Sequence, residues 1–288
     1  MKVLVLGASG MLGNAVMRVL SESAALDVVG TLRSAAGRRD FAPAIADKML
    51  VGIDVEHSDA LVAAFAQARP AVVINCVGLV KQLASAEDPL QAIPINTLLP
   101  HRLARLCAVA GARLVHISTD CVFDGARGHY LETDASDAQD LYGKSKYLGE
   151  VTEGNVVTLR TSIIGHELHS AHSLVDWFLA QGANCRGYTR AIFSGLPTVE
   201  LARIIRDVVL PQPQLQGLYH VAAAPISKFD LLTLVARQYE KTITITPDPA
   251  LCIDRSLDAT RFNTASGFAP APWPELIASM HAYRPTSK

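Results

Sequence analysis

The sequence has few charged residues and almost no excess of either sign. Asp, Glu, Lys and Arg make up 18% of its 288 residues, and 26 basic against 27 acidic residues leave a formal net charge of −1. Domains that bind nucleic acid usually present a basic face, so this balance argues against a nucleic-acid partner. With 50% hydrophobic residues, the chain has ample material for a buried core.

Long apolar runs and closely spaced cysteines are also missing. No apolar run reaches the ~18 residues of a membrane-spanning helix. Met1 leads into a short apolar run without the layout of a signal peptide, and no two of the five cysteines have CxxC spacing. We therefore expect reduced thiols, no metal site, no membrane partner and a cytoplasmic location.

Short apolar runs alternate with helical patterns over the first two thirds of the chain. The runs are rich in Val, Ile and Leu and nearly continuous, which is typical of strands buried on both faces of a parallel sheet. The alternation predicts an α/β fold with a doubly wound parallel sheet of the Rossmann type. The expected strands are 3–6, 28–31, 49–55, 71–75, 113–118 and 156–160, and the expected helices are 11–21, 58–68, 94–110 and 141–153.

The regular alternation of apolar runs and helical patterns ends at about residue 165, after which proline and glycine are frequent between shorter elements. We therefore predict a dinucleotide-binding domain over 1–165 and a smaller C-terminal substrate-binding lobe over 166–288. The expected helices of this lobe are 173–181, 199–209, 228–240 and 273–281, and its expected strands lie near 217–222 and 242–246.

Three glycines with GxxGxxG spacing follow the first expected strand and open the first expected helix. Glycine lets the backbone turn tightly and approach a pyrophosphate, and a helix N-terminus offers free N–H groups to it. The pattern predicts a dinucleotide site, and a tight turn without a ligand is the alternative. The residues expected to bind the cofactor here are Gly7, Ser9, Gly10, Met11, Leu12 and Gly13.

The end of the second expected strand indicates which dinucleotide is bound. An acidic residue there binds the ribose hydroxyls of NAD, whereas an Arg accommodates the 2′-phosphate of NADP. The chain has Arg33 and no acid at this point, which favours NADPH and leaves NADH as the second choice. As an alternative, Arg33 is one of several solvated charges in its loop. Further cofactor contacts are expected from Asp54, Val55, Asn75, Cys76 and Val77.

Tyr142 and Lys146 are four residues apart in an expected helix, so their side chains share one face. An ammonium near a phenol lowers the phenol pKa, which would make Tyr142 an acid/base near neutral pH. Thr119 leaves the 113–118 strand at the sheet edge where ligands bind, so its hydroxyl could contact the substrate oxygen that Tyr142 protonates. A cap of a turn or helix is the alternative role for Thr119.

With these elements in order, the chain resembles an extended short-chain dehydrogenase/reductase over nearly its full length. It is most similar to the dTDP-4-dehydrorhamnose reductase family of sugar-nucleotide reductases. The motifs that carry the resemblance are GxxGxxG at 7–13, VIN at 73–75, Asn96, STDxVFDG at 118–125, YGKSK at 142–146 with GE at 149–150, LRTS at 159–162, PT at 197–198 and DRSLD at 254–258.

The resemblance implies an NADPH-dependent reductase of a nucleotide-linked 4-keto-6-deoxyhexose, whose product would feed a bacterial surface polysaccharide. Hydride would be delivered to carbon 4 of the sugar while Tyr142 protonates the ketone oxygen. Lys146 would tune Tyr142 and hold the nicotinamide ribose, and Thr119 would orient the ketone.

The resemblance also adds residues outside the catalytic set. Asn96 would be a further cofactor contact, and the second lobe would bind the sugar nucleotide. Lys81 and Arg255 are the additional substrate-binding candidates. The expected partner is a nucleotide-linked 4-ketosugar, and a homodimer is left open.

Cys121 stands where this family often has an aromatic residue. In epimerase/reductases of the GDP-fucose synthase type, a cysteine lies two residues after the catalytic hydroxyl and acts with a histidine of the second lobe. Cys121 and His172 could serve in this way as acid/base groups beside the sugar ketone. A small buried thiol is the alternative for Cys121.

Two further alternatives stay open at the level of function. One is a reductase of a UDP-linked N-acetylated 4-ketosugar, because no residue fixes the base or the substituent at carbon 2. The other is a non-catalytic NADP-binding regulatory subunit, since one branch of the family serves methionine adenosyltransferase in that role.

Overall fold

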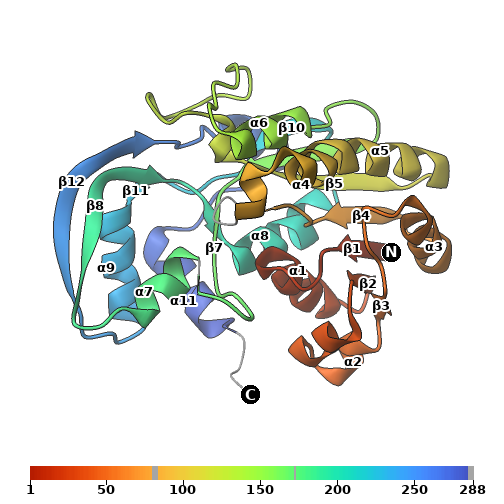
Figure 1. Cartoon of the computed structure of the whole chain (residues 1–288), viewed down its shortest axis with the longest axis horizontal. Coiled ribbons are helices and arrows are strands. Elements are labelled where there is room, and N and C mark those ends of the chain that lie inside the picture. Colours follow the sequence, from red (N-terminus) through yellow and green to blue (C-terminus); the bar gives the residue numbers. More distant parts are fainter. Residues whose placement is uncertain (80–83, 172, 285–288) are drawn as a thin grey trace.

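A seven-stranded parallel sheet lies at the centre of the molecule (Figure 1). The structure, a computed structural model, describes residues 1–79, 84–171 and 173–284. The strand order is β10-β6-β5-β4-β1-β2-β3, and neighbouring strands all run parallel. The strands are β1 (Lys2–Leu6), β2 (Asp27–Leu32), β3 (Met49–Val51), β4 (Val72–Asn75), β5 (Arg113–Thr119), β6 (Val156–Thr161) and β10 (Gly217–His220).

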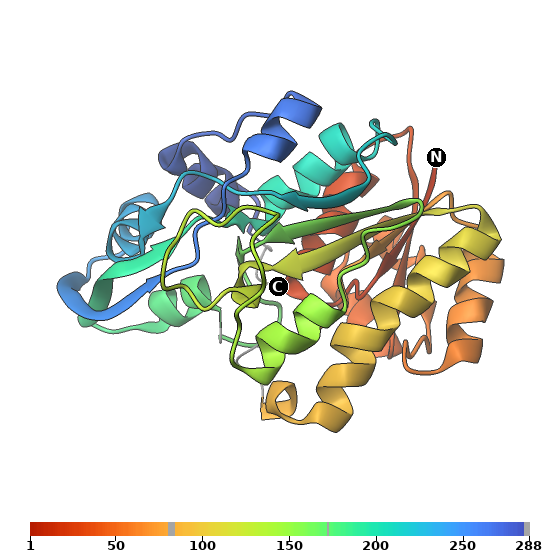
Figure 2. The same cartoon turned by 90° about the horizontal axis from the view of Figure 1, so that it is seen from above.

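Helices cover both faces of this sheet, as the view from above shows (Figure 2). The predicted α/β fold with a doubly wound parallel sheet is therefore confirmed. The α-helices are α1 (Met11–Ser21), α2 (Pro43–Ala46), α3 (Ser58–Ala68), α4 (Pro89–Ala92), α5 (Leu99–Ala110), α6 (Leu141–Leu148), α7 (Leu174–Ala180), α8 (Thr198–Ile204), α9 (Lys228–Gln238), α10 (Thr260–Ser266) and α11 (Trp273–Ala282). Short 3-10 helices are η1 (Ala35–Asp40), η2 (Ala84–Glu87) and η4 (Asp120–Val122), and π-helical segments are η3 (Ile93–Leu98) and η5 (Ile205–Val209).

Strand β1 shows why its sequence is apolar without interruption. Val3 and Val5 pack into a core with residues of α1 and α8 on one face of the sheet. Leu4 and Leu6 pack with residues of α3 and α5 on the other face. Because successive side chains of a strand point to opposite faces, both sets must be apolar when helices cover both sides.

A second, three-stranded sheet carries the outer part of the C-terminal half and lies beside the central sheet (Figure 1). Its order is β11-β8-β12, with β8 in the middle, and α9 packs against it. The strands are β8 (Asn184–Phe193), β11 (Ile226–Ser227) and β12 (Thr244–Asp254), and a separate short pair is formed by β7 (Ile163–Ile164) and β9 (Leu196–Pro197).

Two elements end at least four residues earlier than the sequence predicted. The strand expected over 49–55 ends at Val51, because Gly52 adopts φ +81° and turns the chain out of the sheet. The helix expected over 141–153 ends at Leu148. Gly149 then passes so close to Asn96 that an added Cβ would lie 1.9 Å from the Asn96 carbonyl oxygen.

Two others are longer than predicted. The helix expected from residue 94 begins at Pro89, where the Asp88 side chain accepts a hydrogen bond from Leu90 N–H at 2.9 Å. The strand expected over 242–246 continues to Asp254 as β12. It tolerates its two prolines because it lies at the edge of its sheet, where one side of the backbone needs no ladder hydrogen bonds.

The central sheet draws on both predicted domains. Strand β10 comes from the C-terminal half and pairs with β6 at the sheet edge.

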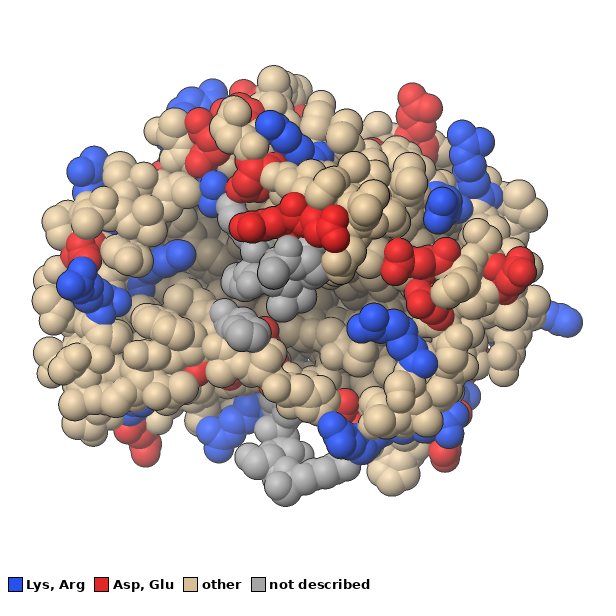
Figure 3. Space-filling view, in the orientation of Figure 1, with Lys and Arg blue, Asp and Glu red and all other residues tan. Residues whose placement is uncertain are grey.

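On the face drawn in Figure 3, basic and acidic side chains are interspersed, in keeping with the small net charge. None of the described helices combines the length and apolar character needed to cross a bilayer.

Candidate active site

The turn between β1 and α1 has the geometry of a phosphate-binding loop. Gly7 adopts φ +79°, and Gly10 N–H donates to the Gly7 carbonyl at 3.0 Å. A Cβ at Gly13 would lie 2.0 Å from the Gly7 carbonyl oxygen, so the first turn of α1 packs directly against the loop. Among the described residues, none caps the N-terminus of α1 with its side chain, which leaves backbone N–H groups for an anion.

Basic residues lie at the carboxyl end of β2. Arg33 follows the strand directly, and its side chain is exposed. Ser34 caps η1 by accepting from Ala36 N–H at 3.3 Å, and Arg38 donates to the Met49 carbonyl at 3.1 Å. The segment after β2 thus contains a short helix, whose Arg38 is anchored to the first residue of β3.

The segment after β4 passes over the glycine loop. Asn75 is fully buried and accepts from Val77 N–H at 3.1 Å, while Cys76 N–H donates to the Leu6 carbonyl at 3.1 Å. A Cβ at Gly7 would lie 2.9 Å from Val77 Cγ2. The predicted cofactor residues of these two segments are therefore neighbours in space.

Asp54 and Val55 follow β3 and are both half-buried. One carboxylate oxygen of Asp54 accepts from Glu56 N–H at 3.0 Å, and the other lies 3.5 Å from His57 Nδ1. These two predicted cofactor contacts thus follow the strand next to β2, at the same end of the sheet as Arg33, and the Asp54 carboxylate stabilises its own turn.

Asn96 connects the segment after β4 to helix α6. It is 1% exposed, accepts from Leu79 N–H at 3.0 Å and donates to Ser145 Oγ at 3.2 Å. An added Cβ at Gly78 would lie 3.5 Å from Asn96 Oδ1 and 3.8 Å from Lys146 Nζ. Lys146 is therefore close to the loop that follows β4, as a residue that holds the nicotinamide ribose must be.

Thr119 and Tyr142 are brought together as predicted. Thr119 ends β5, and its side chain lies close enough to Tyr142 on α6 to lower the pKa of that phenol. Helix α6 approaches the turn after β5 so closely that a Cβ at Gly143 would lie 2.3 Å from the Cys121 carbonyl oxygen. Thr119 Oγ1 also accepts from Cys121 N–H at 3.1 Å, so the residue caps η4 as well.

The electrostatics of the pair differ from the sequence-based expectation. Burial raises the pKa of Tyr142, and Cys121 adds to this, whereas Thr119 acts in the opposite direction. Lys146 Nζ donates to the Ile117 carbonyl at 2.8 Å, and burial lowers the pKa of Lys146 to about 8. The prediction of a lowered Tyr142 pKa is thus wrong for the protein chain, because burial of the phenol raises its pKa more than Thr119 lowers it.

Two cations of the C-terminal half face the end of β5. Arg255 donates from Nε to the Phe123 carbonyl at 2.7 Å. Burial raises the pKa of Asp120, and the positive charge of Arg255 lowers it in part. Burial lowers the pKa of Lys228, and the nearby charge of Asp120 counteracts this. Cys121 raises the pKa of Tyr142 and of Lys228, so the thiol is near residues from both halves of the chain.

The two cations follow the two strands that flank β8. Ser227 and Asp254 both pair with Ile192, on opposite sides of β8. Lys228 comes directly after Ser227 and Arg255 directly after Asp254, and because β11 runs antiparallel and β12 parallel to β8, the chain continues in opposite directions from these two points. Lys228 was missed in the sequence, although a serine N-cap followed three residues later by an aspartate marks it as the first residue of α9.

Two predicted site residues lie outside the described residues. They are the substrate-binding candidate Lys81 and the acid/base candidate His172. The partnership of Cys121 with His172 therefore stays a prediction, while Cys121 itself lies half-buried and close to Tyr142.

Comparison with known proteins places this geometry in a family. A family model described as "RmlD substrate binding domain" matches residues 1–282. A dTDP-4-dehydrorhamnose reductase from Streptomyces griseus is 34% identical over 148 residues, which are 51% of this chain and 43% of the relative. The methionine adenosyltransferase 2 subunit beta of Mus musculus is 25% identical over 306 residues, covering 96% of this chain and 88% of the relative.

A solved structure supports the same assignment at the level of the fold. The dTDP-4-dehydrorhamnose reductase of Bacillus anthracis in complex with NADP superimposes with a TM-score of 0.79 at 21% identity, and the match covers 98% of this chain and 99% of that one. The glycine loop, the Thr-Tyr-Lys arrangement and the near-complete match of the family model agree with the resemblance found in the motifs. The chain therefore belongs to the RmlD substrate-binding domain family.

Proposed function

We propose that this protein is an NADPH-dependent reductase of a nucleotide-linked 4-keto-6-deoxyhexose, with dTDP-4-dehydrorhamnose as the first candidate substrate. The observation that carries the proposal is the contact between Thr119 and Tyr142, with Lys146 buried beside the loop that follows β4. The similarity to named dTDP-4-dehydrorhamnose reductases supports the substrate class.

Each part of the site has a role in this reaction. The glycine loop would hold the pyrophosphate of the dinucleotide, and Arg33 its 2′-phosphate. NADPH supplies the hydride for the sugar ketone. Tyr142 donates its proton to the ketone oxygen, and its raised pKa keeps the phenol protonated at neutral pH. Thr119 orients the ketone, and Arg255 with Lys228 provides positive charge for the anionic nucleotide diphosphate.

The setting of the reaction is part of the proposal. All five cysteines are free thiols, which suits the reducing cytoplasm. The product would serve the synthesis of a bacterial surface polysaccharide, and the protein is expected to work either alone or as a homodimer.

The direct test is NADPH oxidation with a panel of dTDP-, UDP- and GDP-linked 4-ketosugars. Tyr142→Phe should lower turnover by about 10²–10⁴-fold, the usual contribution of a positioned acid. Tyr147→Phe is the matched control, since Tyr147 lies on the same helix and is 44% exposed. Full turnover of Tyr142→Phe with every accepted substrate would refute the assignment of Tyr142.

A second candidate function has one observation in its favour. The mouse methionine adenosyltransferase subunit matches nearly the whole chain, so a non-catalytic NADP-binding subunit is the competing proposal. Protein that binds NADPH yet reduces no member of the panel would support this role. A UDP-linked substrate is distinguished from a dTDP-linked one by the same panel.

A further inference from the structure

A buried ion pair lies next to the end of β5, the strand that carries Thr119. The guanidinium of Arg160 on β6 donates twice to Glu150, from Nε to Oε1 and from Nη2 to Oε2, both at 2.7 Å. The two side chains are only 2% and 5% exposed, respectively. A buried pair of this kind is not needed for stability as such, since apolar residues of similar volume often replace it. Its position therefore calls for another explanation.

Glu150 is bonded to one of the elements that carry the proposed catalytic groups and lies close to the other in sequence. Ser118 Oγ donates to Glu150 Oε1 at 2.6 Å, and Ser118 is the residue before Thr119 on β5. Glu150 lies two residues after the end of α6 and four after Lys146. Burial lowers the pKa of Lys146, and the negative charge of Glu150 acts in the opposite direction. One carboxylate thus joins the end of the catalytic strand to the segment after the catalytic helix.

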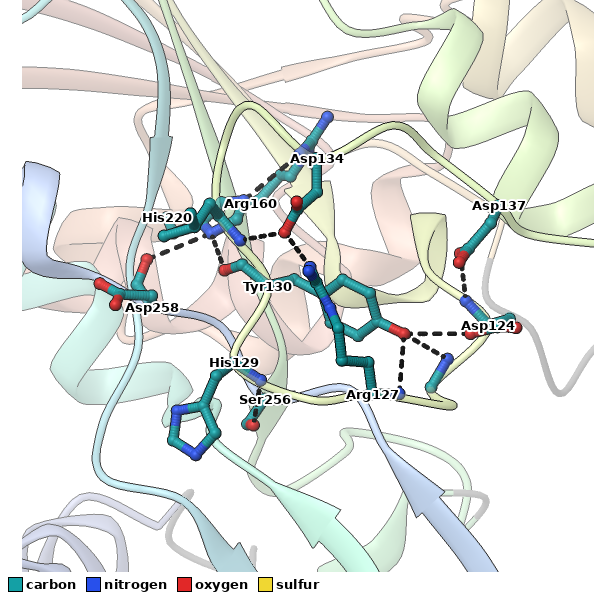
Figure 4. A network of polar contacts seen from close by, with 12 residues as sticks. Asp124, Arg127, His129, Tyr130, Asp134, Asp137, Arg160, His220, Ser256 and Asp258 are labelled. Atoms are coloured by element: carbon teal, nitrogen blue, oxygen red, sulfur yellow. Dashed lines mark hydrogen bonds and ion pairs between the residues drawn. The ribbon is translucent and has the colours of Figure 1, made fainter.

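The other side of Arg160 is fixed by a neutral histidine (Figure 4). Arg160 Nη1 lies 3.3 Å from His220 Nε2, while His220 Nδ1 lies 3.0 Å from the Tyr130 carbonyl and 3.2 Å from that of Asp258. Nδ1 must therefore carry the proton and Nε2 accept from Arg160. Burial, aided by Arg160, lowers the pKa of His220 to about 4, so this ring adds no charge near neutral pH.

The groups that face Lys146 from other elements are also uncharged. His116 on β5 is fully buried, and burial together with Lys146 holds its pKa well below the usual value. Asn96 on η3 is neutral, as is the phenol of Tyr142 on α6 itself. Within the described part of the chain, Glu150 is the carboxylate whose charge acts on the Lys146 ammonium.

We propose that Glu150 is a positioning residue for the reduction, holding Ser118 and Thr119 in place at the end of β5 and providing the negative charge that the buried ammonium of Lys146 faces. The proposal rests on the proposed function, because it concerns the Thr119, Tyr142 and Lys146 arrangement. It extends that function by adding a group that acts through Lys146 and through the end of β5. Arg160 and His220 serve to fix the orientation of this carboxylate.

The first test measures the titration of Lys146 without turnover. The parent chain and Glu150→Gln are labelled with acetic anhydride across a pH series, and acetylation of the Lys146 peptide is followed by mass spectrometry. The midpoint should lie near pH 8 in the parent and about one unit lower in Glu150→Gln, because loss of a nearby opposite charge disfavours the ammonium. Glu153→Gln, which removes an exposed carboxylate three residues further on, should leave the midpoint unchanged.

The direction of the shift separates a charge effect from damage to the fold. Loosening of the structure would expose Lys146 and move its midpoint up, toward the ~10.4 of a free lysine. Loss of the Glu150 charge moves it down. If Glu150→Gln does not fold, Glu150→Gln with Arg160→Gln removes both buried charges, and its midpoint should still lie below that of the parent.

A kinetic readout completes the design. The alkaline fall of kcat/KM for NADPH oxidation should begin at lower pH in Glu150→Gln than in the parent, whereas Glu150→Asp, which keeps the charge, should recover most of the parent profile. An unchanged or raised Lys146 midpoint in a folded Glu150→Gln variant would overturn the proposal. Absence of turnover in the parent would instead count against the proposed function, while the labelling result would still decide the role of Glu150.

Discussion

Lys146 combines two properties that rarely occur together at a single residue. Its side chain is almost fully buried, and yet its ammonium donates to the Ile117 carbonyl and faces the Glu150 carboxylate. Burial lowers its pKa to about 8, within reach of ordinary assay conditions. We therefore expect the titration of Lys146 to make the reaction depend on pH near pH 8.

We expect turnover to fall above about pH 8. Lys146 holds its proton below its pKa and loses it above, and the neutral amine can no longer stabilise negative charge at Tyr142. Tyr142 does not titrate in this window, because its own pKa is raised. The measurement is kcat/KM for NADPH oxidation as a function of pH.

Two substitutions on the same helix make this pH profile diagnostic. Lys146→Arg keeps the charge at all accessible pH values, so its residual turnover should show no fall near pH 8. Lys144→Met removes an exposed cation and should leave the parent profile intact. A fall near pH 8 that persists in Lys146→Arg would assign the titration to another group.

At the scale of elements, the β1-loop-α1 unit was predictable because local chemistry determines it. Three glycines between an apolar run and an amphipathic helix leave few other structures, and the close contact of Gly13 with Gly7 explains the spacing. The site residues on β5 and α6 were predictable for a similar reason, since each lies at a fixed offset from an element end.

Replacing Gly13 by Ala should disrupt this unit. The new Cβ would lie 2.0 Å from the Gly7 carbonyl oxygen, so the loop and the first turn of α1 must separate. We expect at least a tenfold weaker NADPH affinity by titration calorimetry and a loss of about 1–3 kcal/mol of stability, as for other overpacked sites. Gly182→Ala, where a Cβ meets no atom within 4 Å, is the control. Parent affinity in Gly13→Ala would show that the loop does not hold the dinucleotide.

Other elements could not be predicted from local sequence. Strand β8 escaped prediction because its burial pattern does not alternate cleanly, and most of β12 because prolines interrupt it. Their pairing depends on contacts between segments some 60 positions apart, as between Cys185 and Ile245. Lys228 follows β11, which pairs with β8, so its placement near Asp120 likewise depends on contacts between distant segments.

At the scale of the whole molecule, one hydrophobic core extends through both halves of the chain. It contains residues of α1 and β1 together with residues of α8, α9 and α11. Trp273 on α11 belongs to this core, lies beside Phe193 of β8 with ring centroids 5.7 Å apart, and donates from Nε1 to the Ala224 carbonyl at 2.6 Å. Unfolding should therefore be a single cooperative transition.

The two tryptophans of the chain offer a matched test of this cooperativity. Trp273→Ala should cost about 3–5 kcal/mol in urea denaturation, because it removes a large side chain that is only 7% exposed. Trp177→Ala, at a position that is 40% exposed, should cost much less. Both variants should keep one transition. Two separate transitions in either would mean that the halves unfold independently.

The pairing of β10 with β6 limits how this protein can change. A strand from the C-terminal half forms the edge of the central sheet. The two halves of the chain therefore cannot be recombined between relatives as independently folding domains. A chain truncated before β10 would expose the full edge of β6, a ready template for aggregation. New sugar specificity must therefore arise within the segments on either side of β10, which carry β8 before it and β11, α9 and β12 after it.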